Sequence, residues 1–185
     1  MEMKNIVVIG AIATVVFAAV GSYVSAANIG NQFEQQIKYK FRDNENVLAQ
    51  YGQKVTEMAG VTGLAATDLQ KTIKEAISGR YGDGGVKAAM VMITEQNPTI
   101  DAALYRNIQT TISAGRDRFE SAQTQRLSIC QSYETKIGTV FGGMMMRIAG
   151  YPRIDLEGVM CKPVSTARAD EAFRTGIEST PLLKR

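Results

Sequence analysis

The 185-residue sequence contains no histidine and no tryptophan, and it has only 2 cysteines and 4 prolines. Without histidine the chain lacks the side chain best suited to proton transfer near neutral pH, which is also the commonest metal ligand. Without tryptophan its core must be built from aliphatic residues, 9 methionines, 6 phenylalanines and 7 tyrosines. At this length we expect one domain of ordinary size plus an appended segment.

The chain also lacks an excess of charge of either sign. Its 21 basic and 18 acidic residues give a formal net charge of +3, and no basic block is present, so we expect no nucleic-acid partner. Catalysis and metal binding need groups that converge, whereas the carboxylates are scattered over helix-patterned segments. We therefore expect no enzyme activity, no metal and no cofactor.

One apolar run is long. Ile6 to Ala27 carries no charge, and as a helix it would measure about 33 Å, against about 30 Å for the hydrocarbon core of a bilayer. We interpret it as an uncleaved transmembrane anchor, 6–27, behind a short N-terminus, 1–5. The residues predicted to contact the membrane are Ile6, Val7, Val8, Ile9, Ile12, Val15, Val16, Phe17, Val20 and Tyr23. The alternative is a cleaved signal peptide, because Val24-Ser25-Ala26 has the small residues of a signal peptidase site.

The charges beside the anchor bear on its orientation. Lys38, Lys40 and Arg42 lie closer to it than any comparable cluster on the N-terminal side. By the positive-inside rule they favour a cytoplasmic bundle on a single-pass protein of a bacterial-type inner membrane. Long domains are exported largely regardless of such charges, so the exported orientation stays open.

Two segments have the spacing of long helices. Apolar residues recur at steps of three and four from Phe33 to Met58, and again from Tyr105 to Tyr133. Each pattern predicts a helix with one narrow apolar stripe, and the alternation of steps is typical of coiled-coil packing. Asn44 interrupts the first stripe, either as a polar residue that sets the register or as a satisfied core asparagine.

The second stripe is the natural partner of the first. Gly115 and Ala122 would leave room for a bulky residue across the interface, such as Phe41, Tyr51 or Phe33. Arg126 also falls on this stripe, and we expect its stem to lie along apolar surface with its charge in water. The two helices are therefore predicted to pack against each other.

Shorter helices are predicted between the long ones. Thr67-Asp68 suits the start of a helix that ends at Ser78-Gly79, and a second helix covers Val86 to Gln96. Pro98 suits the first turn of the following long helix, where its missing N–H would be unpaired in any case.

The segment from Gly79 to Lys87, GRYGDGGVK, is rich in glycine. Its backbone amides could wrap a small anionic or envelope ligand together with Arg80 or Lys87. It lacks both the spacing of a phosphate-binding loop and a preceding strand, so we favour a plain turn between helices.

The C-terminal part begins with a methionine run: Met144, Met145 and Met146. Methionines at helical spacing usually fill cores, which we favour here, and sometimes form an adaptable interaction surface. Beyond Pro152 we expect a short irregular extension with one extended piece at Ile154 to Val159 and a last helix around Ala167 to Gly176. The end, from Ser179, is expected to be loose.

These pieces occur in the order seen in a known family. The anchor is followed by YKFRDNENVLAQYGQKV (39–55), a helix after Asn97-Pro98, ESAQTQRLSICQSYETKIG (120–138) and AGYP (149–152). In order and spacing the chain from residue 6 to 152 resembles the LemA family. Arg42-Asp43 with Asn46-Val47-Leu48 looks like a degenerate form of that family's DLIPNLV-like stretch, without its proline.

The resemblance implies an all-α fold. An N-terminal transmembrane helix is followed by an antiparallel bundle of long helices, 28–152, and a short irregular C-terminal extension, 153–185, with the bundle in the cytoplasm. It implies no particular activity. We expect a membrane-anchored protein that acts by protein–protein interaction, as a scaffold or assembly factor, through self-association or the methionine surface. The alternatives are an exported, signal-cleaved structural protein and a ligand-binding module.

The two cysteines allow two interpretations. If the helix runs to Gly150, Cys130 lies about 30 Å back along it, and the residues from there to Cys161 can extend about 36 Å. A disulfide is therefore within reach, and it would indicate an oxidising compartment and an exported bundle, against the charge bias and the family's topology. We favour two unrelated buried thiols.

Overall fold

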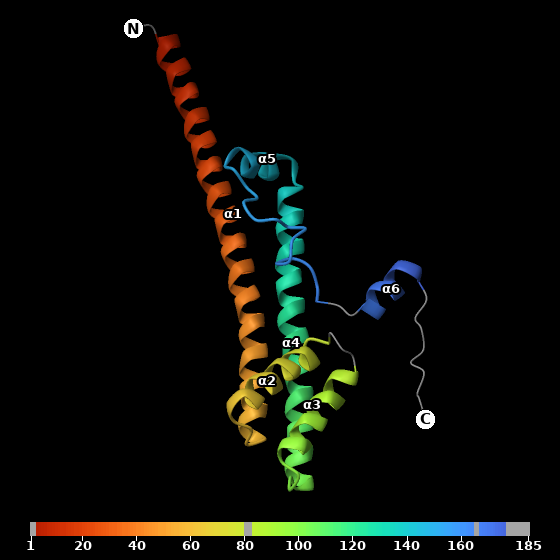
Figure 1. The fold of residues 1–185 in the computed structure, drawn as a ribbon. Helices are drawn as coiled ribbons and strands as arrows, with labels where there is room; N and C mark the ends of the chain where they lie inside the picture. Colours follow the sequence, from red (N-terminus) through yellow and green to blue (C-terminus); the bar gives the residue numbers. More distant parts are fainter. Residues whose placement is uncertain (1–2, 80–82, 165–166, 177–185) are drawn as a thin grey trace. The chain divides into compact units, whose positions relative to one another are not determined.

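The computed structural model describes residues 3–79, 83–164 and 167–176, and its fold is drawn in Figure 1. The regular structure of these residues is entirely helical, which confirms the all-α class. The helices are α1 (Met3–Met58), α2 (Gly63–Ile77), α3 (Asp83–Gln96), α4 (Ala102–Ile137), α5 (Val140–Ile148) and α6 (Ala167–Thr175).

α1 is one uninterrupted helix of 56 residues. It passes from the apolar run into the patterned segment without a break, because no proline lies in this part of the sequence to interrupt its hydrogen bonds. It ends just before Gly60, whose φ of 66° is a left-handed conformation typical of the residue that follows a helix.

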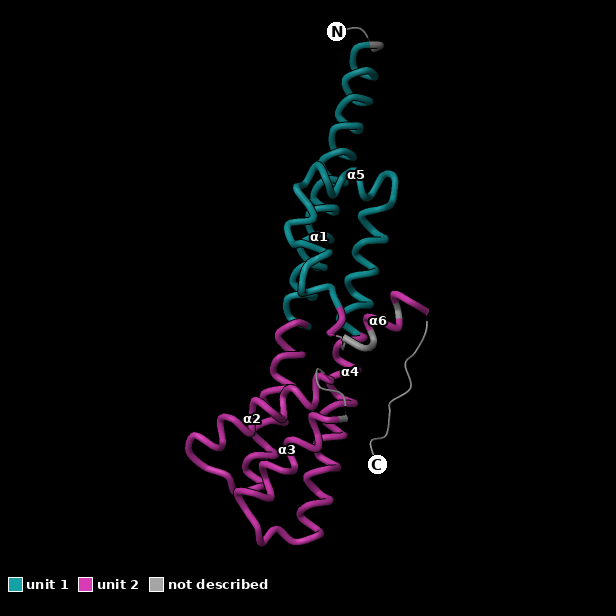
Figure 2. The backbone as a smooth tube through the Cα atoms, turned by 45° about the vertical axis from the view of Figure 1, so that its right-hand side comes forward, with its two compact units in different colours: residues 1–40, 125–162 teal, residues 41–124, 163–185 magenta. Residues whose placement is uncertain are grey.

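The chain divides into two compact units, coloured separately in Figure 2. Unit 1 comprises Met1–Lys40 and Gln125–Lys162, and unit 2 comprises Phe41–Thr124 and Pro163–Arg185. Each unit has a buried apolar cluster of its own. Each takes one part of α1 and one part of α4, so it combines segments that lie far apart in the sequence.

Both predicted stripes are confirmed as packing surfaces, since none of their residues is exposed. In unit 1, the ring of Phe33 stacks on that of Tyr133 with centroids 5.2 Å apart, and Lys40 Nζ donates to Gln125 at 2.9 Å. The partner's number in α4 falls as the number in α1 rises, so the two helices are antiparallel within this unit.

Unit 2 packs parts of α1 and α4 with α2 and α3 around one apolar cluster. Each of the four helices supplies a fully buried residue, namely Val55, Ile73, Ile93 and Ile112. The Thr111 hydroxyl of α4 lies 3.6 Å from Met58 Sδ at the end of α1. Because burial of apolar surface is the main favourable term in folding, this cluster is what holds the helices of unit 2 together.

Three predicted helix starts are wrong. α3 begins at Asp83, three residues before the predicted start at Val86. α2 begins at Gly63, earlier than Thr67, because Leu64, Ala65 and Ala66 have high helix propensity. α4 begins after Pro98 rather than with it. Asp101 Oδ1 accepts a hydrogen bond from the Leu104 N–H at 2.7 Å, so a side-chain cap and not the proline starts this helix.

Asn44 lies where the stripe predicted it, on the packed face of α1 within unit 2. Its side chain is 3% exposed, and its Oδ1 has no hydrogen-bond partner among the residues that the structure describes. A buried polar atom left in this state costs about 1–3 kcal/mol. The alternative of a fully satisfied core asparagine therefore does not hold for this oxygen, and a role in register stays a prediction.

Gly115 of α4 receives the ring of Tyr51, as the pairing of small with large residues predicted. A Cβ built on Gly115 would lie 2.9 Å from Tyr51 Cγ and 2.9 Å from Ile77 Cδ1, closer than side-chain carbons approach each other. The absence of a side chain at Gly115 therefore lets α4, α1 and α2 meet inside unit 2.

We expect Gly115→Leu to lower the free energy of unfolding by about 1–3 kcal/mol, because the added atoms overpack the cluster of unit 2. The neighbouring Ala114 is exposed, so Ala114→Leu adds a leucine to the same helix without entering the core. Urea unfolding in detergent, followed by far-UV circular dichroism, measures both. Equal midpoints for the two variants would contradict the close packing at Gly115.

The irregular segment, which runs from Tyr151 to Lys162 after α5, completes unit 1. The predicted extended piece at Ile154 to Val159 is wrong: the Asp155 carboxylate accepts from the Glu157 N–H at 2.9 Å, and the Asp155 carbonyl accepts from the Gly158 N–H at 3.2 Å. These short-range bonds form turns in place of an extended strand. Most apolar side chains of this segment pack on the buried cluster of unit 1, whereas Val159 is 75% exposed.

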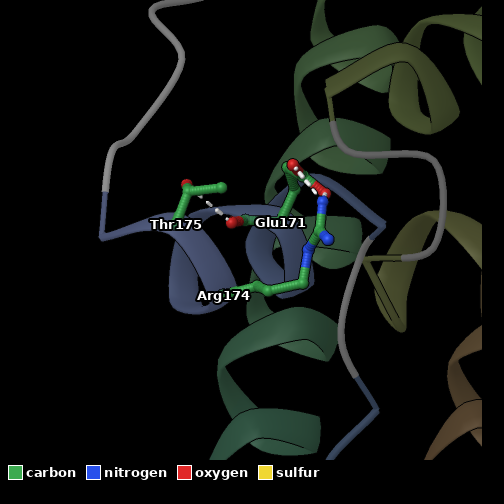
Figure 3. Close-up of polar contacts among 3 residues, drawn as sticks. All are labelled: Glu171, Arg174 and Thr175. Atoms are coloured by element: carbon green, nitrogen blue, oxygen red, sulfur yellow. Dashed lines mark hydrogen bonds and ion pairs between the residues drawn. The ribbon is translucent and has the colours of Figure 1, made fainter.

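The predicted last helix is confirmed as α6, which belongs to unit 2. Figure 3 shows its polar contacts: Arg174 Nη2 contacts both oxygens of Glu171 at 2.7 and 2.8 Å, and the Thr175 hydroxyl donates to the Glu171 carbonyl. Both charged side chains are more than half exposed, so this ion pair contributes little to stability. The predicted loose end from Ser179 lies outside the described residues.

Candidate functional site

The first half of α1 is apolar around its whole circumference. From residue 5 to 25 every side chain is exposed except the half-buried Ser22. The residues predicted to contact a membrane all lie here, from 45% exposed at Tyr23 to 78% at Phe17. A helix in contact with water normally confines its apolar residues to one stripe, whereas a helix that is apolar all round is suited to a protein core or to lipid.

Among the described residues, α1 is the one helix long and apolar enough to cross a membrane. It contains an 18-residue window with a mean hydropathy of 2.3, none of which is buried in the protein. A helix of about 20 residues spans the hydrocarbon core. A signal peptide shares these properties, so length and composition identify a candidate span and not its fate.

The pattern of α1 changes at Ala26. From there buried positions recur at Ala26, Gly30, Glu34 and Ile37, which share one helix face, and the exposed residues between them are polar. A Cβ on Gly30 would overlap the ring of Tyr151, so this face packs closely against the segment that follows α5. The exposed apolar run ends where the packed face of unit 1 begins.

α5 is held beside α1 by a tight connection from α4. The Thr139 side chain accepts a hydrogen bond from the Gly143 N–H at 3.1 Å and so caps α5. Gly143 is needed here, because a Cβ at this position would overlap the backbone of Ile137. Figure 1 shows that α5 lies across the direction of α1.

The three methionines of α5 point to different surroundings. Met146 is 1% exposed in the buried cluster of unit 1, Met145 is half-buried against this cluster, and Met144 is 48% exposed. Successive helix positions differ by about 100°, so three consecutive residues cannot share one face. The structure thus gives Met146 to the core and leaves Met144 on the surface.

The exposed side of α5 is apolar. Its large exposed residues, which we call the α5 outer face, are Val140 (93% exposed), Phe141 (61%), Met144 (48%) and Ile148 (61%). In water the outward side of a short surface helix is usually polar. Contiguous exposed apolar groups mark a site of contact with a protein or a membrane.

α1 and α5 border an open groove of about 540 Å³ in unit 1. α1 lines it with residues from Ala18 to Ile29, and α5 lines it with Phe141, Met145 and Met146. Lys136, at the end of α4, is the charged residue of this lining. The last turns of the apolar run and α5 therefore lie at the same level of unit 1.

Glu34 is a buried carboxylate that the sequence analysis did not single out. It is 3% exposed, and its Oε1 accepts hydrogen bonds from the Tyr133 hydroxyl at 3.1 Å, from the Arg153 N–H and from the Ile154 N–H at 3.3 Å. Burial, and then the negative charge of Glu34, raise the pKa of Tyr133 above its ordinary value. Tyr133 therefore keeps its proton and remains a donor. Glu34 joins α1, α4 and the irregular segment.

Three contacts of aromatic rings lie around this carboxylate. The ring of Tyr151 covers Gly30, and the Arg153 guanidinium lies over that ring, 4.4 Å from its centroid. Phe33 stacks on Tyr133 from the neighbouring position of α1. These contacts fix the irregular segment against both long helices, which favours a structural role for Glu34 over a catalytic one.

The favoured interpretation of two unrelated buried thiols is wrong, because the structure contains the disulfide. Cys130 of α4 forms a disulfide with Cys161, with their Cα atoms 5.8 Å apart. Close to this bond, Arg126 Nη2 donates to the Lys162 carbonyl at 2.8 Å, and Arg126 is 2% exposed. The expectation that its charge lies in water is therefore wrong, because the tethered segment covers it. Burial lowers the pKa of its guanidinium.

The glycine-rich segment is described only in part, since residues 80–82, including Arg80, lie outside the described residues. Lys87 belongs to α3 and lines an open groove of about 520 Å³ in unit 2, together with Tyr105 and Gln109. It is the single cation in a largely apolar lining, which offers an anion one charge and no enclosing cage. In the described part of the chain, no group of three or more acidic or cysteine side chains could hold a metal ion.

The residues that sequence reasoning missed are the ones whose role depends on the irregular segment. Glu34 had one local signal: it lies four positions after Gly30 and three before Ile37, on the same helix face.

Comparison of the chain with family models, with curated proteins and with solved structures finds no match in any of the three.

Proposed function

We propose that the chain is a single-pass, membrane-anchored helical-bundle protein of LemA-like type, which acts by protein–protein interaction as a scaffold or assembly factor and not by catalysis. The observation that carries the proposal is the composition of α1. Its first half is exposed and apolar all round, and its second half is polar with one packed face. One continuous helix thus has the surface chemistry of a membrane anchor and of a bundle helix.

The use of the buried charged groups supports interaction over catalysis. Glu34 and Arg126 both bond to backbone groups of the irregular segment, so their polar atoms serve to hold unit 1 together. A catalytic group has to reach a substrate, and these two side chains are at most 3% exposed.

We further propose that the bundle lies on the oxidising side of the membrane. The Cys130–Cys161 disulfide supports this side, because disulfides persist in oxidising compartments and are rare in the cytosol. Lys38, Lys40 and Arg42 favour the opposite orientation, but a bundle of this size can be exported despite such charges. We give the disulfide more weight.

Extraction of membranes tests the anchor. The full-length chain should stay in the pellet after an alkaline carbonate wash, with an intact mass that includes residues 6–27. Val15→Glu with Val16→Glu should release it, because a carboxylate at the centre of the bilayer costs about 2.5–3.5 kcal/mol. Ala49 and Gln50 are exposed in unit 2, so Ala49→Glu with Gln50→Glu adds two carboxylates outside the anchor and should leave the chain in the pellet.

Two results would each refute the anchor. In one, the unmodified chain leaves the membrane at full length. In the other, its mass shows that it begins near Ala27, which would favour the exported, signal-cleaved alternative.

A further inference from the structure

We propose that α5 is a second membrane contact, a short helix that lies in the lipid headgroup region beside the anchor with its outer face toward the acyl chains. This inference rests on the proposed membrane anchoring. It assigns the exposed apolar surface of unit 1 to a lipid partner and not to a protein.

The part of α1 that precedes the groove is too short to cross a bilayer by itself. Ala18 is the first residue of α1 that lines the groove shared with α5. The stretch from Asn5 to Phe17 measures only about 20 Å as a helix, whereas the hydrocarbon core is about 30 Å thick. The remaining thickness has to be spanned by residues from Ala18 toward Val24. Those residues lie beside α5, so an anchor that spans the bilayer brings α5 to the membrane surface.

The chemistry of α5 fits this position. Val140, Phe141, Met144 and Ile148 form an outward surface that is unfavourable in water, and each is between 48% and 93% exposed. Helices that lie in the interface place such a face about 5–10 Å into the boundary between headgroups and acyl chains. α5 crosses the direction of α1, so it would lie along the membrane plane when α1 stands across it (Figure 1).

The charges around α5 complement an anionic lipid surface. From Thr135 to Ile154 the sequence contains Lys136, Arg147 and Arg153 and no acidic residue. All three basic side chains are exposed. Long basic side chains can lay their stems along apolar surface and reach the headgroups with their charge. Tyr23 of α1 is 45% exposed at the same level, where tyrosine is enriched in membrane proteins.

α5 is also held in a fixed place, as a membrane-contacting helix beside an anchor requires. Met146 is buried in the cluster of unit 1, and the Tyr151 N–H that follows α5 donates to the Met146 carbonyl at 2.9 Å. Gly143 keeps the start of α5 close to the end of α4. The outer face therefore does not need to reorganise in order to meet lipid.

The absence of tryptophan makes a direct test available. Three full-length variants each carry one tryptophan: Phe141→Trp on the α5 outer face, Phe17→Trp in the anchor, and Tyr39→Trp on a 66% exposed position of α1 in unit 1. Each is reconstituted into vesicles of phosphatidylcholine and phosphatidylglycerol that contain lipids with a nitroxide either near the headgroup or deep in the acyl chain. Far-UV circular dichroism verifies that all three keep their helix content.

We expect the emission of Phe141→Trp to lie at shorter wavelength than that of Tyr39→Trp and to lose more intensity with the shallow nitroxide than with the deep one. Phe17→Trp should lose more with the deep nitroxide, and Tyr39→Trp should lose little with either. If Phe17→Trp is quenched and Phe141→Trp is not, the anchor stands and the inference about α5 fails. A blue-shifted but unquenched Phe141→Trp would then indicate a second copy of the chain on this face. If Phe17→Trp is not quenched, the membrane anchoring fails, and the inference fails with it.

Discussion

Glu34→Ala is expected to lower the free energy of unfolding of unit 1 by about 3–5 kcal/mol. The substitution removes the oxygen that accepts from Tyr133, Arg153 and Ile154, and it leaves these donors without that acceptor in the interior. An unsatisfied buried group costs about 1–3 kcal/mol. Urea unfolding of the full chain in detergent, followed by far-UV circular dichroism, measures the loss.

Two further variants test whether the loss of stability comes from the missing acceptor oxygen of Glu34. Glu34→Gln keeps a carbonyl oxygen at the same position, so it should cost clearly less than Glu34→Ala. Glu45 is exposed on the same helix, and Glu45→Ala should change the free energy of unfolding by less than about 0.5 kcal/mol. A Glu34→Ala chain as stable as Glu45→Ala would show that the buried carboxylate does not hold the irregular segment.

The long helices could be predicted because their signal is local. Steps of three and four residues repeat over many turns of α1 and α4, and each step needs only the identity of near neighbours in the sequence. The same repeats placed Gly115 opposite a bulky residue, which the contact with Tyr51 confirms. Helix starts were harder, because Pro98 and Asp101 both suit a first turn and only the Asp101 side chain accepts the capping bond.

The centre of unit 1 could not be predicted in the same way. Its irregular segment has no period, and its partners are remote: Glu34 and Arg153 lie 119 residues apart in the sequence. Arg126 was expected to place its charge in water because nothing in the sequence near it shows that Lys162 folds over it. Chain reach allowed a disulfide but could not require one, so the sequence favoured two unrelated thiols at Cys130 and Cys161, and the fold shows them bonded.

Removal of the disulfide is expected to cause the other large loss in the free energy of unfolding. Cys130 and Cys161 are 31 residues apart, and a loop of this length gives about 3–4 kcal/mol of stabilisation by restricting the unfolded chain. The double variant Cys130→Ala with Cys161→Ala should lose this amount from the free energy of unfolding of unit 1. The unmodified chain treated with a reductant should fall to a similar stability.

The part of the chain that loses stability distinguishes a local effect of the disulfide from a general loss of stability. The segment that runs from Tyr151 to Lys162 should lose protection from amide hydrogen exchange, because the disulfide and the Arg126 bond hold its end. Ile73 and Ile93 lie in the separate cluster of unit 2, and their amides should keep their protection.

The redox state of the two cysteines in native membranes also reports the side of the membrane on which the bundle lies. Denaturation in the presence of a thiol reagent should label neither cysteine unless a reductant is added first. Labelling of both without reductant would put the bundle in a reducing compartment and overturn the proposed orientation.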